Sequence, residues 1–235
     1  MLPQNFVILA PGPTSNLLGS SISIKGVNEN PTSDFSKGAL YSTAIYATSP
    51  GDYPYGFEVL RAWLDGDMVV MPRDALYEKS EKPKVATARQ KQEMVESQLN
   101  GAIAALNFIK SIPTYSKPSW SESDVKIVLN KVGGGSAGLA FALALIAKSA
   151  DPKLIAGRKI AATGTISQNG KVGAIGGVDQ KILGAKKSGA QIFLAPKSNC
   201  SSISKRPKGL EIYGVSNLSE AVHILAGAEN SAFAC

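Results

Sequence analysis

The sequence predicts an α/β fold, in the broad sense that includes α+β, because segments typical of strands alternate with segments typical of helices. Strand character is clearest at residues 39–47, 159–166, 191–195 and 210–215, and helical character at 84–109, 137–147, 178–187 and 218–225. The 235 residues are 44% hydrophobic and 18% charged, an ordinary composition for a chain that buries a sizeable core. One large domain or two small ones fit this length.

The first third of the chain is irregular. Residues 1–38 are rich in Pro, Gly, Ser and Asn and contain only short strand-like pieces, at 6–9 and 21–24. A short helix is expected at 57–63, where Asp65-Gly66 ends it, and a short strand at 68–71. We therefore expect an N-terminal extension over residues 1–83 with short strands packed on a core, the core itself over 84–226, and a frayed tail over 227–235.

The middle of the chain holds a strand, three glycines, a serine and a helix in that order. Residues 125–132 alternate as a strand does, Gly133–Gly135 follow, and Ser136 precedes the apolar run 137–147. Glycines allow a sharp turn, serine is a preferred helix N-cap, and the first N–H groups of a helix are free to bind an anion. The segment therefore predicts either a nucleophilic hydroxyl beside backbone donors or simply a capped, buried helix.

The second half contains a hairpin and a second glycine-initiated helix. Asn169-Gly170 predicts a tight turn between strand segments 159–166 and 171–175. Gly176-Gly177 opens the helix 178–187, and Gly189 is placed to end it. The last helix, 218–225, is expected to be capped by Ser216 or Asn217.

Several classes of function are disfavoured. The net charge is +7, but the basic residues are dispersed and lack interleaved aromatic residues, so we expect no nucleic-acid partner. No apolar run reaches the roughly 20 residues of a membrane helix, and residues 1–10 lack the pattern of a signal peptide, so the chain as written is expected to be soluble. Cys200 and Cys235 lack metal-ligand spacing; they could pair in an oxidising compartment, although terminal residues are usually poorly ordered.

A serine nucleophile needs a neighbouring base. The single histidine, His223, lies in an ordinary amphipathic helix, which favours a structural role. Lys181 is the other candidate, because it lies in the first turns of the glycine-initiated helix, between Val178 and Ile182. Burial and a helix N-terminus both lower a lysine pKa, although periodicity alone would make Lys181 an ordinary exposed lysine.

The order of several motifs resembles the proteolytic domain of Lon proteases. Residues 136–138 (SAG) follow glycines, 162–165 read ATGT, and 173–181 read GAIGGVDQK. The family carries GPSAG, a TGE-like strand and a PIGGLKEK-like helix start in the same order. Residues 94–97 (MVES) are similar to its VMKES helix, and 189–196 (GAQIFLAP) to the segment that ends in its VLIP strand. The resemblance spans about residues 85–226.

This resemblance implies a Lon proteolytic-domain fold, related to the GHMP-kinase architecture, with no metal or cofactor. It places the catalytic serine on Ser136 and the catalytic lysine on Lys181, with Thr163 in support. The backbone N–H groups near Gly135 and Ala137 are expected to bind the oxyanion. Family members assemble into rings of six, so the resemblance also implies a homo-oligomer.

The N-terminal part is most similar to the bacterial YlbL-like group, membrane-anchored proteins with a PDZ and a Lon domain. The similar residues are 10–14 (APGPT), 57–64 (FEVLRAWL) and Asn199-Cys200. If an anchor precedes this chain, the resemblance implies the extracytoplasmic side of a bacterial membrane; otherwise the location stays open. About 15 residues separate the helix 84–109 from the strand 125–132, too few for a PDZ module.

Two further departures bear on function. Gly135 stands where the family has proline, which loosens the turn before Ser136. The sequence contains no GxxxxGK[ST] motif, so we expect no ATPase module in this chain.

We therefore expect an ATP-independent serine endopeptidase with a Ser136–Lys181 dyad that cleaves peptides or unfolded protein segments. Two alternatives stay open: a Lon-fold binding or scaffold protein with weak or no catalysis, and a small-molecule phosphotransferase of the related kinase architecture. The second is disfavoured because no acidic residue lies between positions 125 and 150 to hold a metal.

Overall fold

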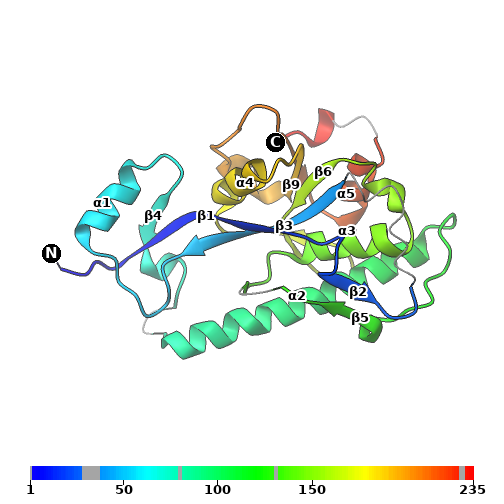
Figure 1. Cartoon of the computed structure of the whole chain (residues 1–235), viewed down its shortest axis with the longest axis horizontal. Coiled ribbons are helices and arrows are strands. Elements are labelled where there is room, and N and C mark those ends of the chain that lie inside the picture. The colour runs from blue at the N-terminus through cyan, green and yellow to red at the C-terminus, as the bar shows by residue number, and fades with distance from the viewer. Residues whose placement is uncertain (1, 28–37, 79–80, 130–131, 228–230) are drawn as a thin grey trace.

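The computed structural model describes residues 2–27, 38–78, 81–129, 132–227 and 231–235. Its main feature is a six-stranded sheet with the order β10-β9-β6-β3-β1-β4, parallel from β10 to β3 and antiparallel from β3 to β4 (Figure 1). The strands are β1 (Phe6–Asn16), β3 (Ala39–Ala47), β4 (Val69–Pro72), β6 (Lys159–Ala162), β9 (Ile192–Pro196) and β10 (Glu211–Val215).

Residues 1–83 contribute three of these strands, β1, β3 and β4. Their backbone is hydrogen-bonded into the sheet, with β3 joined to β6 of the later chain. Strand pairing between distant segments satisfies backbone groups that would otherwise need water. The domain boundary at residue 84 stays a prediction.

The pairing of β3 changes along its length. β6 ends at Ala162, opposite Ser42, while β3 continues to Ala47 with β1 on its other side. In the ranges that the structure describes, no strand pairs with this edge of β3 after Ser42. The backbone of residues 43–47 therefore offers unpaired peptide groups on one side.

Helices cover both faces of the sheet. They are α1 (Gly56–Leu64), α2 (Pro83–Ser111), α3 (Gly138–Ser149), α4 (Val178–Lys187) and α5 (Leu218–Leu225), with short 3-10 turns at Arg73–Ala75, Glu122–Asp124, Pro152–Leu154, Lys197–Ser202 and Ser231–Phe233. None of the helices in the described ranges combines the length and apolar composition that a membrane crossing requires. α1 and β4 lie at the left end of Figure 1, near the N-terminus.

Alternating side chains on β6 assign these helices to faces. Ile160 and Ala162 pack in the cluster that contains α3 and α5, whereas Ala161 between them packs with Val178 and Ile182 of α4. Successive strand residues point to opposite faces, so α3 and α4 lie on opposite sides of the sheet. This layering decides how the beginnings of the two helices meet.

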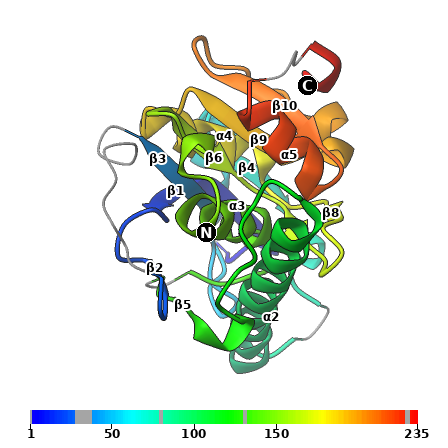
Figure 2. The same ribbon diagram turned by 90° about the vertical axis from the view of Figure 1, so that its right-hand side faces the viewer.

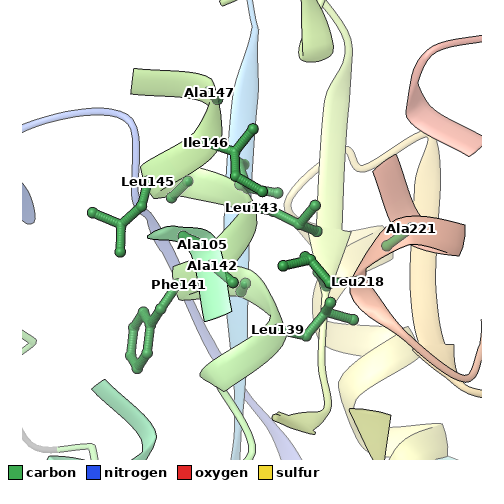
Figure 3. Close-up of a cluster of buried hydrophobic side chains, with 14 of the residues drawn as sticks. Ala105, Leu139, Phe141, Ala142, Leu143, Leu145, Ile146, Ala147, Leu218 and Ala221 are labelled. Carbon is green, nitrogen blue, oxygen red and sulfur yellow. The ribbon is translucent and has the colours of Figure 1, made fainter. Parts of the chain in front are cut away.

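α3 is the centre of the core. All its residues from Gly138 to Ala147 are buried, and it lies near the middle of the molecule in Figure 2, in contact with both α2 and α5. Leu139 and Leu143 point toward Leu218 of α5, while Phe141 points to the opposite side of the helix (Figure 3). Each fully buried Leu or Phe contributes about 2 kcal/mol of transfer free energy, so this helix anchors the fold.

Close packing of α2 on α3 depends on a glycine. A Cβ added at Gly101 would lie 3.0 Å from the Cβ of Phe141 and 3.1 Å from the carbonyl oxygen of Gly138. Gly101 therefore allows the α2 backbone to approach the first turns of α3.

Several strand predictions were too long. Only Val125–Ile127 (β5) forms a strand within 125–132, and it pairs with β2 (Ile22–Ile24) outside the main sheet; residues 130–131 lie outside the described residues. Segment 159–166 is split into β6 and β7 (Thr165–Ile166), because Gly164 takes a φ of +152° that bends the chain. The predicted hairpin around Asn169-Gly170 joins β7 to β8 (Val172–Gly173).

Two predictions are corrected, one about the start of a helix and one about the C-terminal tail. Helix α3 begins at Gly138 with Ala137 in the N-cap position, so Ser136 lies in the preceding turn and is not the cap. The described part of the tail is not frayed: the Cys235 N–H donates to the Ile212 carbonyl at 3.0 Å, and Cys235 forms a disulfide with Cys200. Asn217 is the cap of α5, since its Oδ1 accepts from the Glu220 N–H.

Candidate active site

Ser136 lies in the turn that joins the glycines to α3. Gly134 has a φ of +86°, which favours glycine, and its N–H donates to the Gln90 carbonyl of α2 at 2.8 Å. The Gly135 carbonyl accepts from the Ser97 hydroxyl of α2 at 2.9 Å. Contacts with α2 therefore hold the turn, and Ser136 is partly buried at its end.

Lys181 enters the same site from the other face of the sheet. Gly177 holds the N-cap of α4 with a φ of +65°, and Lys181 lies in the second turn of this helix with only 3% of its surface exposed. Its Nζ donates to Ser136 Oγ at 2.7 Å. Thus the two residues predicted from the sequence are within hydrogen-bond distance of each other.

Thr163 connects these two residues. It is fully buried directly after β6, where the sheet ends between α3 and α4. Its Oγ1 accepts from Lys181 Nζ at 3.2 Å and donates to the Ser136 carbonyl at 3.1 Å. The Gly164 N–H donates to the same carbonyl at 2.8 Å, so the Ser136 carbonyl accepts two hydrogen bonds that fix its direction.

The environment of Lys181 favours its neutral form. Burial lowers the pKa of Lys181 from 10.5 to about 7, because the protein interior solvates an ammonium poorly. Within the described residues, no carboxylate forms an ion pair with Lys181 that would restore its charge. The pKa therefore lies close to neutral pH, where the amine can lose its charge and accept a proton.

A cavity of about 730 Å³ adjoins the Ser136 and Lys181 side chains. Its walls include the open edge of β3, the glycine turn, the segment before α4 and one side of α2. The lining residues of these four parts are Ser42–Ala47, Gly133–Ala137, Ala174–Gly176 and, on α2, Arg89, Gln90, Glu93, Met94, Glu96, Ser97 and Asn100. The cavity is large enough for several residues of an extended peptide.

Backbone amides also lie beside this cavity. Gly135 and Ala137 line the cavity, and among the described residues no hydrogen-bond acceptor is assigned to either amide. Whether these amides bind an oxyanion, as the sequence predicted, stays a prediction. In the described ranges, no group of three or more His, Cys, Asp or Glu residues is placed to hold a metal ion.

His223 lies away from the site. It is exposed on α5, where its ring lies 6.2 Å from the Phe233 ring, and it does not line the cavity. The structural role predicted for it fits this position.

Sequence reasoning assigned no role to Ser97 or Asn199. Asn199 is buried, and its side chain accepts from the Ile175 N–H and donates to the Ile175 carbonyl, both at 3.0 Å. It thereby holds the cavity wall before α4. Both residues lie within segments that resemble the Lon family, but a single polar residue in a helix or turn carries no local sign of such contacts.

Comparisons with known proteins identify the family of this chain. The model of the Lon protease (S16) C-terminal proteolytic domain matches residues 67–226, more than half of the chain. Lon protease 2 of Bacillus subtilis is 40% identical over 105 residues, which cover 43% of this chain and 19% of the relative. Lon protease 1 of Borreliella burgdorferi is 28% identical over 141 residues, covering 57% of this chain and 17% of the relative.

The chain spans less than a fifth of the length of these two relatives. The matched segment contains Ser136, Thr163 and Lys181, and the fold is the mixed α/β arrangement expected from the resemblance. The chain belongs to the family of the Lon protease (S16) C-terminal proteolytic domain.

Proposed function

We propose that this chain is a serine endopeptidase that uses a Ser136–Lys181 dyad and needs no ATP for cleavage. The observation that supports this proposal best is the 2.7 Å contact between Lys181 Nζ and Ser136 Oγ, made by an amine that is only 3% exposed. A buried neutral amine next to a hydroxyl is the arrangement that a serine nucleophile requires when no histidine is available.

In the first step, Lys181 accepts the Ser136 proton while Oγ attacks the carbonyl carbon of a peptide bond. The C–N bond then breaks, and the proton passes from Lys181 to the leaving amine, which leaves an acyl ester on Ser136. Lys181 next takes a proton from a water molecule, whose oxygen attacks the ester. The acid product leaves and Ser136 regains its proton, so the dyad is restored.

Thr163 has an orienting role in this proposal. Its hydroxyl accepts from Lys181 and donates to the Ser136 backbone, which keeps the Nζ directed at Oγ. Backbone amides at Gly135 and Ala137 bind the carbonyl oxygen as it becomes negative, an interaction worth about 3 kcal/mol for each donor.

The substrate is an extended peptide or an unfolded segment that lies along the open edge of β3. Residues 43–47 line the cavity, and no strand in the described ranges pairs with their outer edge, so a bound chain could form backbone hydrogen bonds there. A folded protein would have to open before its backbone reached this edge. Assembly into a homo-oligomeric ring is a further part of the proposal and rests on the family resemblance.

The test measures cleavage of internally quenched peptides and of β-casein without nucleotide, together with labelling by a fluorophosphonate probe that reacts with activated serines. Wild type should cleave and be labelled, and kcat/KM should rise with pH through about 7 and then level off, because only neutral Lys181 is a base. Ser136→Ala and Lys181→Ala should each lose activity by at least about 10³-fold.

Lys187→Ala is the matched control, because Lys187 is an exposed lysine on the same helix. If Lys181→Ala is labelled at the wild-type rate, Lys181 is not the base. If wild type neither cleaves nor reacts with the probe, the chain is a binding or scaffold protein.

A further inference from the structure

Ser97 contacts the nucleophile turn from a neighbouring helix. It lies on α2, is only 4% exposed, and its Oγ donates to the Gly135 carbonyl at 2.9 Å. A Cβ added at Gly138 would come within 3.1 Å of this same oxygen, so the hydroxyl is enclosed between α2 and the first residue of α3. The contact joins segments 38 residues apart and cannot form within α2 alone.

The direction of this bond decides where the Ser136 amide points. In a trans peptide the N–H lies opposite to the C=O, and the described residues contain no cis peptide. Because the Gly135 carbonyl is held toward Ser97, the Ser136 N–H of the same peptide points away from α2. The described contacts contain no such anchor for the Gly135 N–H, which belongs to the preceding peptide.

The next peptide is held in the same manner. The Ser136 carbonyl accepts from the Gly164 N–H and the Thr163 hydroxyl, so the Ala137 N–H points away from both. Ser136 and Ala137 line the cavity, next to the hydroxyl that would attack. Two consecutive amides are therefore oriented by donors from α2 and from the residues after β6.

We propose that Ser97 is a positioning residue that holds the Gly135 carbonyl and thereby directs the Ser136 amide at the developing oxyanion. This inference rests on the proposed peptidase function. It also explains why glycine is acceptable at position 135, where the family has proline. The hydrogen bond from Ser97 to the Gly135 carbonyl restricts the backbone there in place of the proline ring. In this inference the Ser136 amide replaces the Gly135 amide of the proposed function as the first oxyanion donor, supported by Ser97, and the Ala137 amide remains the second.

The test compares Ser97→Ala with Ser111→Ala. Ser111 lies at the end of the same helix and its hydroxyl also donates to a carbonyl, that of Phe108 at 2.7 Å, so the control removes a similar bond far from the site. For each variant, kcat, KM, the pH midpoint of kcat/KM and the inhibition constant of a peptide boronic acid are measured. The boronate becomes a tetrahedral anion on the serine and so reports on oxyanion binding.

Ser97→Ala should lower kcat by about 10- to 100-fold, somewhat less than the loss of a whole oxyanion donor. The boronate should bind more weakly by a similar factor. KM should stay at the wild-type value, because the oxyanion forms only after the substrate is bound. The pH midpoint should also stay, because it is set by Lys181, with which Ser97 is not in contact. Ser97→Cys keeps the shape but donates weakly, so its kcat should lie between those of wild type and Ser97→Ala. If Ser97→Ala does not fold, Ser97→Cys provides the test in its place.

The proposal is overturned if Ser97→Ala and Ser97→Cys lose no more kcat than Ser111→Ala, or if the loss appears only in KM. It is also overturned if boronate affinity is unchanged while kcat falls. Failure of the peptidase function itself is recognised separately, because wild type would then neither cleave peptides nor react at Ser136, and both proposals would be wrong.

Discussion

Replacing Lys181 with methionine should abolish peptidase activity and stabilise the fold. The pKa of Lys181 falls from 10.5 to about 7 on burial, which corresponds to about 5 kcal/mol of unfavourable free energy when the group is charged in the unfolded chain. The variant also loses the hydrogen bonds to Ser136 and Thr163, worth together about 1–2 kcal/mol. Below pH 7 we therefore expect a net gain of about 3–4 kcal/mol in the free energy of unfolding.

The stability gain of Lys181→Met should decrease as the pH rises above 7. Between pH 7 and 10.5 the unfolded wild type holds a proton on Lys181 that the folded protein has released, so rising pH stabilises folded wild type. The slope is about 1.4 kcal/mol for each pH unit. Methionine does not titrate, so the advantage of the variant should stay nearly constant below pH 7 and shrink by about 2 kcal/mol between pH 7 and pH 9.

Urea unfolding of the disulfide-bonded chain at pH 6, 7, 8 and 9, followed by tryptophan fluorescence, measures this difference. Subtracting the two proteins at each pH cancels the other titrating groups, which they share. Lys187→Met, on the exposed side of the same helix, should change the free energy by less than about 1 kcal/mol. A Lys181→Met variant that is less stable than wild type, or whose advantage does not change between pH 7 and pH 9, would refute the reasoning.

Three further substitutions test how the site is held. Gly12→Ala should cost about 1–3 kcal/mol in urea unfolding, because the new Cβ would lie 2.7 Å from the Ala44 backbone of β3; a neutral result would show that the strands can separate. Gly135→Ala should keep wild-type kcat and add about 0.4–1 kcal/mol of stability, since the nearest atom to its Cβ is 3.6 Å away; a fall in kcat of tenfold or more would contradict this. Asn199→Ala leaves both polar backbone groups of Ile175 without their partner, so it should cost about 1–3 kcal/mol and raise KM, as the cavity wall loosens. Unchanged unfolding and KM would show that water replaces the side chain.

Local sequence patterns predicted the regular elements well where the signals are contained within one segment. The bounds of β3 (Ala39–Ala47), α4 (Val178–Lys187) and α5 (Leu218–Leu225) agree with the ranges expected from periodicity, glycine and cap residues. Segments 125–132 and 159–166 were predicted less well, because strand length depends on which partner is present and on a glycine bend at Gly164.

The two candidate residues could be predicted from the sequence, since a serine after glycines and a lysine in the first turns of a glycine-initiated helix are recognisable from local chemistry and from the family resemblance. The burial of Lys181 could not be predicted in this way, because periodicity alone predicted a surface lysine and burial depends on α3 and α4 covering opposite faces of one sheet. The same holds for Ser97: its hydrogen bond to Gly135 joins the middle of α2 to the turn before α3, 38 residues further along the chain, and no local pattern encodes the distance between them.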